Sequence, residues 1–338
     1  MDASSSGRPT ADTIPYFDIS DGGPIDLCRL APERLQALIE AGRAHYGSAA
    51  LAVGDRISRN WLTKAQNPYV EEIERIAATV GTAGAFLLNL SYEWTCTTGI
   101  GRDPSGRGNR LLRTLDWPLD GLGRNVVVAR QSGPAGDYYD ATWPGFTGVL
   151  TAMAPGRFSA AINQPPMRRW TPSCWFDWVI NRGHTWQSRA LPPVHLLRRV
   201  FETCETFDDA LRLLTDTPLA LPAFFTLSGN EADEGAIIER DETRAWVRCS
   251  PSAAANHWLE GGSPGDRMRG EDSPGRLSLM KRLRDGTDDG FDWVRPPILN
   301  ATTRLAVVAN ANAGTFVVKG YERDGPVTAP FTLDELLT

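Results

Sequence analysis

Apolar residues in the first part of the chain recur at helical spacing. Between residues 31 and 46 they return every three or four positions, which predicts an amphipathic helix. A second helix is predicted to start at Asn67-Pro68, a favourable cap and first helical residue, and to end at Gly81. The next apolar run, AFLLNLSYEW, is interpreted as a buried strand that leads into Cys96.

After Cys96 the pattern changes to short apolar segments separated by Gly, Pro and Asp, which is typical of strands and turns. Helical spacing returns between residues 193 and 217 and again from Ser273 to Leu283. The segment RLAVVANANAGTFVVKGY predicts a hairpin. Because hairpins dominate and no regular βαβ alternation occurs, we expect one α+β domain with antiparallel sheets covered by helices.

Composition narrows the class of protein. The 338 residues carry a net charge of −6 without a basic run, so we expect no nucleic-acid partner. No apolar run is long enough to span a membrane, and the first residues lack the pattern of a signal peptide. The five cysteines are odd in number and widely spread, which favours a reducing compartment, and we expect a cytoplasmic protein. The four histidines are far apart and no CxxC or phosphate-loop pattern occurs, so no metal or cofactor is expected.

Cys96, taken by itself, is either a buried core residue, as free cysteines commonly are, or a nucleophile. A cysteine nucleophile needs a base, and His257 is one candidate. The other is the α-amino group of Cys96 itself, which becomes available only if the Thr95–Cys96 bond is cut. Downstream, the segment LLRTLDW holds Arg113 and Asp116, which are either an ion pair that holds a loop or groups of the site.

Several stretches of the chain, in order, carry a resemblance to a known family. They are NLSYEWTCTTGIGRDPSGRGNRLLRTLDW, PGRFSAAINQ, FDDALRLLTDTPLALPAFFTLSGNEADEGAIIERD and, more weakly, AANHW. Together they resemble the N-terminal-nucleophile (Ntn) cysteine amidases of the acid ceramidase and N-acylethanolamine acid amidase group. These are related to the choloylglycine hydrolases, which act on bile salts, and to the penicillin V acylases. The resemblance implies a four-layer αββα sandwich, with residues 1–95 as an α chain after self-cleavage and residues 96–338 as the catalytic β chain.

The resemblance also assigns roles to residues of this chain. Cys96 would be both the cleavage residue and the nucleophile, and Arg113 would lie beside its thiolate. Asp116 would accept hydrogen bonds from the new α-amino group. Asn256 would donate to the oxyanion of the tetrahedral intermediate, and Arg276 would complete the catalytic set.

The chain departs from the family pattern at three places. The interval between Cys96 and Arg113 is one residue longer than usual, and Gln164 replaces a glutamate, which removes a charge. Asn256 stands at a position where the family has an aspartate, so Asn163 or a backbone amide is the alternative oxyanion donor. Asn163 and Gln164 are also expected to bind substrate. Trp117 is expected in either the core or an apolar acyl-chain pocket.

The function that follows is hydrolysis of a linear N-acyl amide with a hydrophobic acyl chain, ceramide-like or N-acylethanolamine-like, through a thioester on Cys96. Its expected partners are this small-molecule substrate and the chain's own N-terminal fragment, and a homo-oligomer is left open. Three alternatives remain. They are an acyltransferase of the same fold, a binding protein that never cleaves itself, and an uncut enzyme with a Cys96–His257 dyad.

Overall fold

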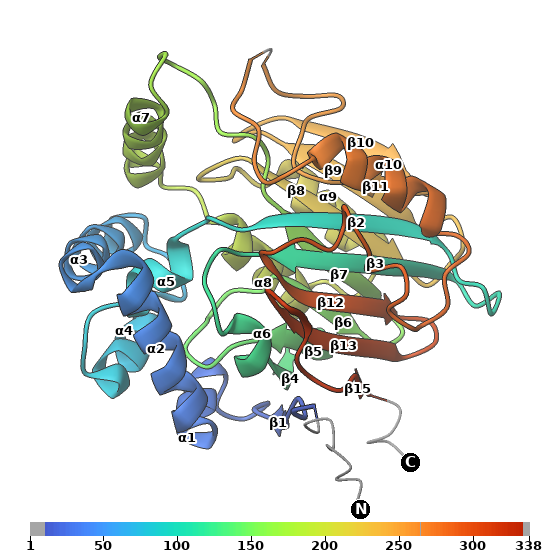
Figure 1. Ribbon diagram of the computed structural model, residues 1–338, viewed down its shortest axis with the longest axis horizontal. Helices are drawn as coiled ribbons and strands as arrows, with labels where there is room; N and C mark the ends of the chain where they lie inside the picture. The colour runs from blue at the N-terminus through green and yellow to red at the C-terminus, as the bar shows by residue number, and fades with distance from the viewer. Residues whose placement is uncertain (1–10, 264, 334–338) are drawn as a thin grey trace, which may run out of the picture.

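The protein consists of two sheets packed face to face between helices, as the computed structural model of residues 11–263 and 265–333 shows (Figure 1). The larger sheet has the order β1-β4-β5-β6-β7-β8-β9-β10. Its strands are β1 (Tyr16–Asp18), β4 (Val127–Gly133), β5 (Gly136–Thr142), β6 (Thr151–Ala154), β7 (Phe158–Asn163), β8 (Ala223–Gly229), β9 (Gly235–Arg240) and β10 (Ala245–Cys249). Neighbouring strands are antiparallel except β1, which pairs with β4 in parallel.

The second sheet carries Cys96. Its order is β11-β2-β3-β12-β13-β14, with β15 also paired to β13. The strands are β2 (Thr95–Arg102), β3 (Asn109–Asp116), β11 (Ser252–Ala254), β12 (Thr303–Asn310), β13 (Thr315–Glu322), β14 (Gly325–Pro326) and β15 (Phe331–Thr332), and all their pairings are antiparallel.

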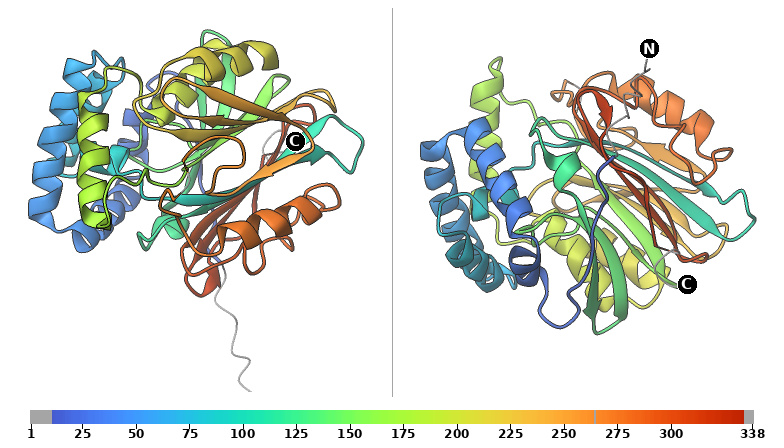
Figure 2. Two further views of the ribbon diagram at one scale, coloured as in Figure 1. Left: turned by 90° about the horizontal axis from the view of Figure 1, so that it is seen from above. Right: turned by 60° about the horizontal axis from the view of Figure 1, so that its bottom comes forward.

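Helices cover the outer faces of both sheets. Helices α8 (Pro193–Thr203) and α9 (Phe207–Asp216) pack on the larger sheet, and α10 (Ser273–Leu283) packs on β2 and β11 of the smaller one. The left view of Figure 2 shows the resulting layers edge-on. The predicted four-layer αββα sandwich with largely antiparallel sheets is therefore confirmed.

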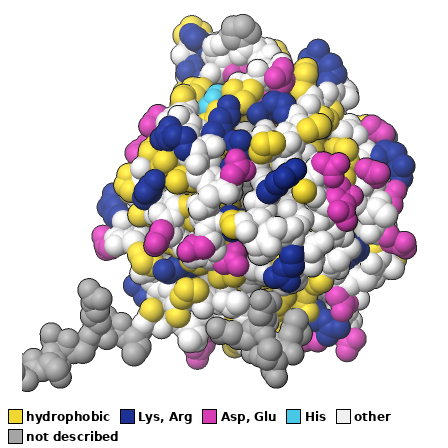
Figure 3. Space-filling view, turned by 90° about the vertical axis from the view of Figure 1, so that its right-hand side faces the viewer, with side chains coloured by type: hydrophobic (Ala, Val, Ile, Leu, Met, Phe, Trp, Pro, Cys, Tyr) yellow, Lys and Arg dark blue, Asp and Glu magenta, His cyan; other side chains and the backbone are white. Residues whose placement is uncertain are grey.

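The remaining helices lie mostly to one side of the sandwich. They are α1 (Pro24–Leu30), α2 (Pro32–Tyr46), α3 (Ser48–Lys64), α4 (Val70–Val80), α5 (Ala85–Leu90) and α7 (Cys174–Gln187), with a single turn, α6 (Leu122–Asn125), at the start of β4 (Figure 1). Within the part of the chain that the structure describes, none of these helices is both long enough and apolar enough to cross a bilayer. On the face drawn in Figure 3, acidic and basic side chains are interspersed rather than gathered by sign.

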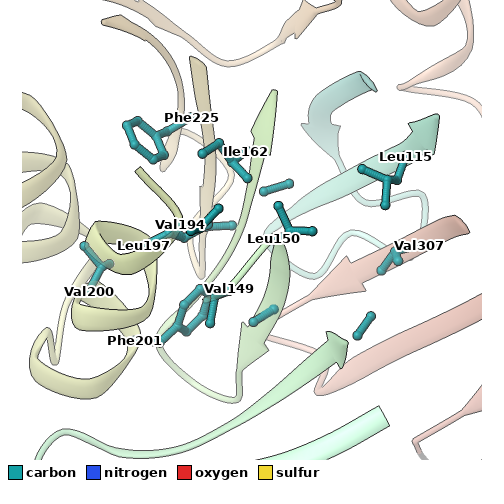
Figure 4. Close-up of a cluster of buried hydrophobic side chains, with 14 of the residues drawn as sticks. Leu115, Val149, Leu150, Ile162, Val194, Leu197, Val200, Phe201, Phe225 and Val307 are labelled. Atoms are coloured by element: carbon teal, nitrogen blue, oxygen red, sulfur yellow. The ribbon is translucent and has the colours of Figure 1, made fainter. Parts of the chain in front are cut away.

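The packing of the core shows toward which side of the smaller sheet the residues around Cys96 point. Leu197, Val200 and Phe201 of α8 pack on the larger sheet, and Leu115 extends from the smaller sheet into the same cluster (Figure 4). Strand alternation turns neighbouring residues of β3 to opposite faces, so Leu112 packs on the α10 side instead. Residues of β2 and β3 therefore face either the space between the sheets or helix α10.

The expectation of a buried strand in AFLLNLSYEW is wrong. Residues 85–90 form helix α5, and an irregular segment leads from it to β2. The helix is supported from outside the segment, because the Asp55 carboxylate of α3 accepts the backbone N–H groups of Gly84 and Leu87 at 2.7 and 2.8 Å. Such capping satisfies N–H groups that have no partner within the helix. A short apolar run alone does not distinguish a helix from a strand.

Candidate active site

Cys96 is the second residue of β2, and its side chain is fully buried between the two sheets. It pairs with Leu115 of β3. The sulfur lies 3.4 Å from the carbonyl oxygen of Ile162 in β7 and 3.3 Å from Nη2 of Arg113. The thiol is thus held between a carbonyl oxygen and a guanidinium group.

Arg113 is completely buried and reaches the thiol from β3. Its Nη2 also donates to the Ile162 carbonyl at 3.3 Å, whereas Nε and Nη1 have no hydrogen-bond partner among the described residues. Burial raises the pKa of the Cys96 thiol to about 11; Arg113 opposes this shift, and Asp116 adds to it. The uncut chain therefore holds a neutral thiol next to a cation that would stabilise the thiolate.

The backbone of Cys96 is fixed by two buried side chains. Its N–H donates to Oδ1 of Asn256 at 2.9 Å, and its carbonyl accepts from Nη1 of Arg276 at 2.8 Å. Arg276 also donates to Oδ1 of Asn256 at 3.0 Å, so the two side chains support each other. Asn256 lies in the loop after β11, and Arg276 lies in helix α10. Both segments are distant from β2 in the sequence. The nitrogen of the predicted scissile bond is consequently held in one position.

Asp116 ends β3 directly opposite Thr95, the residue before the predicted cut. Its Oδ1 accepts from the Thr303 hydroxyl at 2.9 Å. The other oxygen has no hydrogen-bond partner in the described structure and lies 3.7 Å from Nη1 of Arg276. Burial raises the pKa of the Asp116 carboxyl, and Arg276 opposes that shift. Its predicted contact with a free α-amino group stays a prediction, because the chain here is uncut.

The predicted oxyanion donors point elsewhere in the uncut chain. Nδ2 of Asn256 donates to the backbone carbonyl of Gln164 at 2.7 Å. Nδ2 of Asn163 donates to the carbonyl of Ala255 at 3.1 Å, and Oδ1 of Asn163 has no partner in the described residues. Either amide would have to exchange a backbone carbonyl for the oxyanion, so this role stays a prediction.

His257 does not serve as the partner of the thiol in this geometry. Its Nδ1 lies 2.7 Å from the hydroxyl of Ser273, which also accepts the backbone N–H of Asn256 at 2.8 Å. The polar contacts of the Cys96 sulfur in the described structure come from Arg113 and Ile162. The geometry therefore favours the α-amino base over a Cys96–His257 dyad.

Trp117 lines an apolar pocket of about 60 Å³ between the N-terminal helices and the sandwich. Its ring lies 5.2 Å from that of Trp94, two residues before Cys96, and 6.4 Å from that of Trp143. The sequence pattern did not indicate the opposite wall, which comes from α2, α4 and α5 and includes Leu38 and Val80. These residues were expected only as helix faces, so their part in a pocket could not be read from periodicity.

A second, more polar pocket of about 150 Å³ adjoins the segment before Cys96. Tyr92 and Glu93 line it on one side, and Gln164 lines it on another. Its lining includes Arg168, Arg182 and Arg269. The sequence did not indicate these residues, because isolated arginines in loops and a helix form no motif. No group of three or more His, Cys, Asp or Glu side chains within residues 11–263 and 265–333 is placed to hold a metal ion.

Comparisons with known proteins agree with the resemblance. No family model matches the chain. Acid ceramidase of Bos taurus is 25% identical over 295 residues, which cover 77% of this chain and 71% of the relative. N-acylethanolamine-hydrolyzing acid amidase of Cavia porcellus is 25% identical over 250 residues, which cover 64% of this chain and 67% of the relative.

Solved structures show weaker similarity. The Caenorhabditis elegans ortholog of N-acylethanolamine-hydrolyzing acid amidase aligns with a TM-score of 0.49 and 18% identity over 64% of this chain and 93% of that one. Penicillin V acylase from Agrobacterium tumefaciens aligns with a TM-score of 0.38 and 13% identity over 67% and 83% of the two chains. From the sequence matches, the chain is a homologue of acid ceramidase and of N-acylethanolamine-hydrolyzing acid amidase.

Proposed function

We propose that the protein is a self-processing cysteine amidase that hydrolyses linear N-acyl amides through a thioester on Cys96. The observation that supports this proposal most strongly is the environment of Cys96. Its thiol lies 3.3 Å from the guanidinium of Arg113, and its backbone N–H and carbonyl are held by Asn256 and Arg276. This arrangement supports the proposal, because a nucleophilic thiol, a cation that can stabilise its thiolate and the nitrogen of the scissile bond would lie together in one buried site.

Self-cleavage starts from the thiol of Cys96. The sulfur adds to the carbonyl carbon of Thr95, the thiol proton passes to the nitrogen of Cys96, and the C–N bond breaks to leave a thioester. Water then hydrolyses the thioester, which releases the thiol and gives Thr95 a carboxylate. Asn256 Oδ1 already accepts the N–H of Cys96 at 2.9 Å, so it can accept from the free amine that replaces this amide.

The freed α-amine then serves as the base for the amide substrate. It takes the thiol proton while sulfur attacks the acyl carbon, and it returns the proton to the leaving nitrogen. Water hydrolyses the acyl thioester and restores the thiol. Asp116 lies opposite Thr95 in the strand pair, so the amine that the cut creates at Cys96 forms at the next residue and can donate to the Asp116 carboxylate. Arg113 stabilises the thiolate.

The apolar pocket supports an apolar acyl chain as the substrate's acyl half. Trp117, Leu38 and Val80 supply its walls, and Trp117 stacks near Trp94, which precedes the cleavage site. The names of the relatives, acid ceramidase and N-acylethanolamine-hydrolyzing acid amidase, support the same class of lipid-like amides. We also propose a cytoplasmic location, which fits the observation that all five cysteines are free.

Intact mass under denaturing conditions tests the proposal, after incubation of the purified full chain between mildly acidic and neutral pH. Wild type should give two fragments, the larger of which starts at Cys96 and ends at Thr338. Cys96→Ala should stay whole, whereas Cys204→Ala, a matched control at another buried cysteine, should be cut as wild type is.

Arg276→Leu should slow the cut, because it removes the donor to the Cys96 carbonyl and one of the groups that hold Asn256. Release of fatty acid from N-lauroylethanolamine by the cut protein measures the amidase activity. An uncut wild-type chain at every pH, or a cut chain without amidase activity on any N-acyl amide, would contradict the proposal.

A further inference from the structure

The polar pocket beside the cleavage site contains an unmatched positive charge. The pocket adjoins the site at two points of the sandwich. Gln164 lines it two residues after Ile162, whose carbonyl oxygen contacts the Cys96 sulfur. Tyr92 and Glu93 line it just before Thr95. The pocket therefore adjoins two segments that lead to the reacting thiol.

Three arginines line the pocket, and two of them have partners. Arg168 forms a two-pronged ion pair with Glu242, with N–O distances of 3.3 and 3.0 Å. Arg182 of α7 donates to the backbone carbonyls of Leu90 and Ser91. These carbonyls satisfy its N–H groups but leave its charge in place.

Arg269 is the third. Its Nε is buried without a hydrogen-bond partner, and its guanidinium forms no ion pair with any of the described residues. Burial and the nearby charge of Arg182 lower its pKa to about 10, so it remains protonated at neutral pH. Glu93 is the nearby anion, and its carboxylate already accepts from the hydroxyl of Tyr46 at 2.7 Å. One carboxylate thus faces two guanidinium groups, so the partly buried guanidinium of Arg269 keeps a positive charge that no carboxylate of its own offsets.

Arg269 also belongs to the loop that covers the cleavage site. A side chain added at its neighbour Gly270 would come within 2.9 Å of Oγ1 of Thr95 and 3.0 Å of Nη2 of Arg276. The guanidinium is therefore carried by a segment in direct contact with the catalytic centre. An arginine presents a planar array of donors that matches a carboxylate.

We propose that this pocket, through Arg269 with Arg182 beside it, binds an anionic group on the amine half of the substrate, namely the carboxylate of an N-acyl amino acid. The inference rests on the proposed amidase function and specifies its substrate class. The two pockets then divide the substrate. The apolar pocket at Trp117 takes the acyl chain, and the polar pocket takes the charged amine half. Tyr92 and Glu93 line the polar pocket, and Trp117 of the apolar pocket packs against Trp94, so residues just before Cys96 touch the walls of both.

A matched pair of substrates tests the inference. N-lauroylglycine and N-lauroylethanolamine share the acyl chain and differ in whether the amine half ends in a carboxylate or a hydroxyl. Wild type should show the higher kcat/KM for N-lauroylglycine. Arg269→Gln should lower the ratio of kcat/KM for N-lauroylglycine to kcat/KM for N-lauroylethanolamine about ten- to a hundredfold. This is the effect expected from the loss of one charge-assisted contact. Arg269→Lys should recover part of the ratio, and Arg189→Gln, at an exposed arginine, should leave the ratio as in wild type.

The outcomes separate this inference from the proposed function. If wild type hydrolyses both amides and Arg269→Gln leaves their ratio unchanged, the inference is overturned while the amidase function stands. If Arg269→Gln slows both substrates equally and loosens the cut N-terminal fragment, Arg269 instead binds the new carboxylate of Thr95, and the inference is again overturned. If wild type hydrolyses neither amide nor any other N-acyl amide, the proposed function fails and the inference fails with it.

Discussion

His195 sits in surroundings that suit only a neutral imidazole. Asn67 Oδ1 accepts the backbone N–H of Tyr69 at 2.9 Å, which orients the Asn67 NH₂ group toward Nδ1 of His195 at 3.0 Å. Nδ1 is therefore the acceptor, and Nε2 carries the hydrogen and faces the hydroxyl of Thr147 at 3.3 Å. A proton added to Nδ1 would place two donors against each other.

The cost of this arrangement at acidic pH follows from the pKa shift. Burial, with the nearby charge of Arg198, lowers the pKa of His195 from 6.5 to about 3. Below pH 6.5 the unfolded chain binds a proton that the folded chain does not bind until about pH 3, so stability is lost as pH falls through this window. One pKa unit corresponds to about 1.4 kcal/mol, so acidification from pH 6.5 to 5 should cost about 2 kcal/mol at this residue.

Urea unfolding of the uncut Cys96→Ala protein at pH 7 and pH 5 measures this effect. The decrease in the free energy of unfolding between the two pH values should be about 2 kcal/mol smaller in His195→Gln than in the parent. His184→Gln, at an exposed histidine, is the matched control and should behave as the parent does. The comparison uses differences, so any destabilisation of His195→Gln at pH 7 cancels. An equal pH effect in all three proteins would refute the assignment of a neutral, buried His195.

Two further predictions concern the contact with the N-terminal helices. Arg198→Met should lower the free energy of unfolding by about 3–5 kcal/mol, because it leaves the buried Glu72 carboxylate without its ion-pair partner. Urea unfolding measures this loss, and a decrease of less than about 1 kcal/mol would contradict the prediction. Val80→Trp should narrow the apolar pocket and lower kcat/KM for N-lauroylethanolamine at least about tenfold more than for its N-butyryl analogue, because dodecanoyl buries about eight more CH₂ groups. Equal losses with both chain lengths would argue against this pocket as the acyl site.

The alternation of side chains between the two faces of β3 could be predicted from the sequence, but the residues that these side chains contact could not. Strand periodicity places Arg113 and Leu115 on one face and Asp116 on the other, as the structure has them. The position of Cys96 opposite Leu115 depends on the register of β2 with β3, which no local pattern specifies. Sequence therefore indicated the face of the strand on which each residue lies more readily than the residues it meets there.

Long-range support explains the other differences. Helix α5 depends on Asp55 of a neighbouring helix, and a single-sequence pattern contains no information on such a contact. Asn256 and Arg276 lie 160 and 180 residues from Cys96 along the chain, and folding alone brings them to its backbone. Arg269 gave no signal in the sequence, because its significance comes from its place in the folded pocket, where it forms no ion pair with any residue that the structure describes.

Strand β1 links the N-terminal segment to the far edge of the larger sheet. Residues Tyr16–Asp18 pair in parallel with β4, so they cover hydrogen-bonding groups that an edge strand would otherwise expose. If the chain is cut before Cys96, this cover depends on a separate polypeptide. A β chain produced alone, from Cys96 onward, would present the bare edge of β4 and should self-associate. The N-terminal fragment would then keep the mature protein soluble, in addition to lining its apolar pocket.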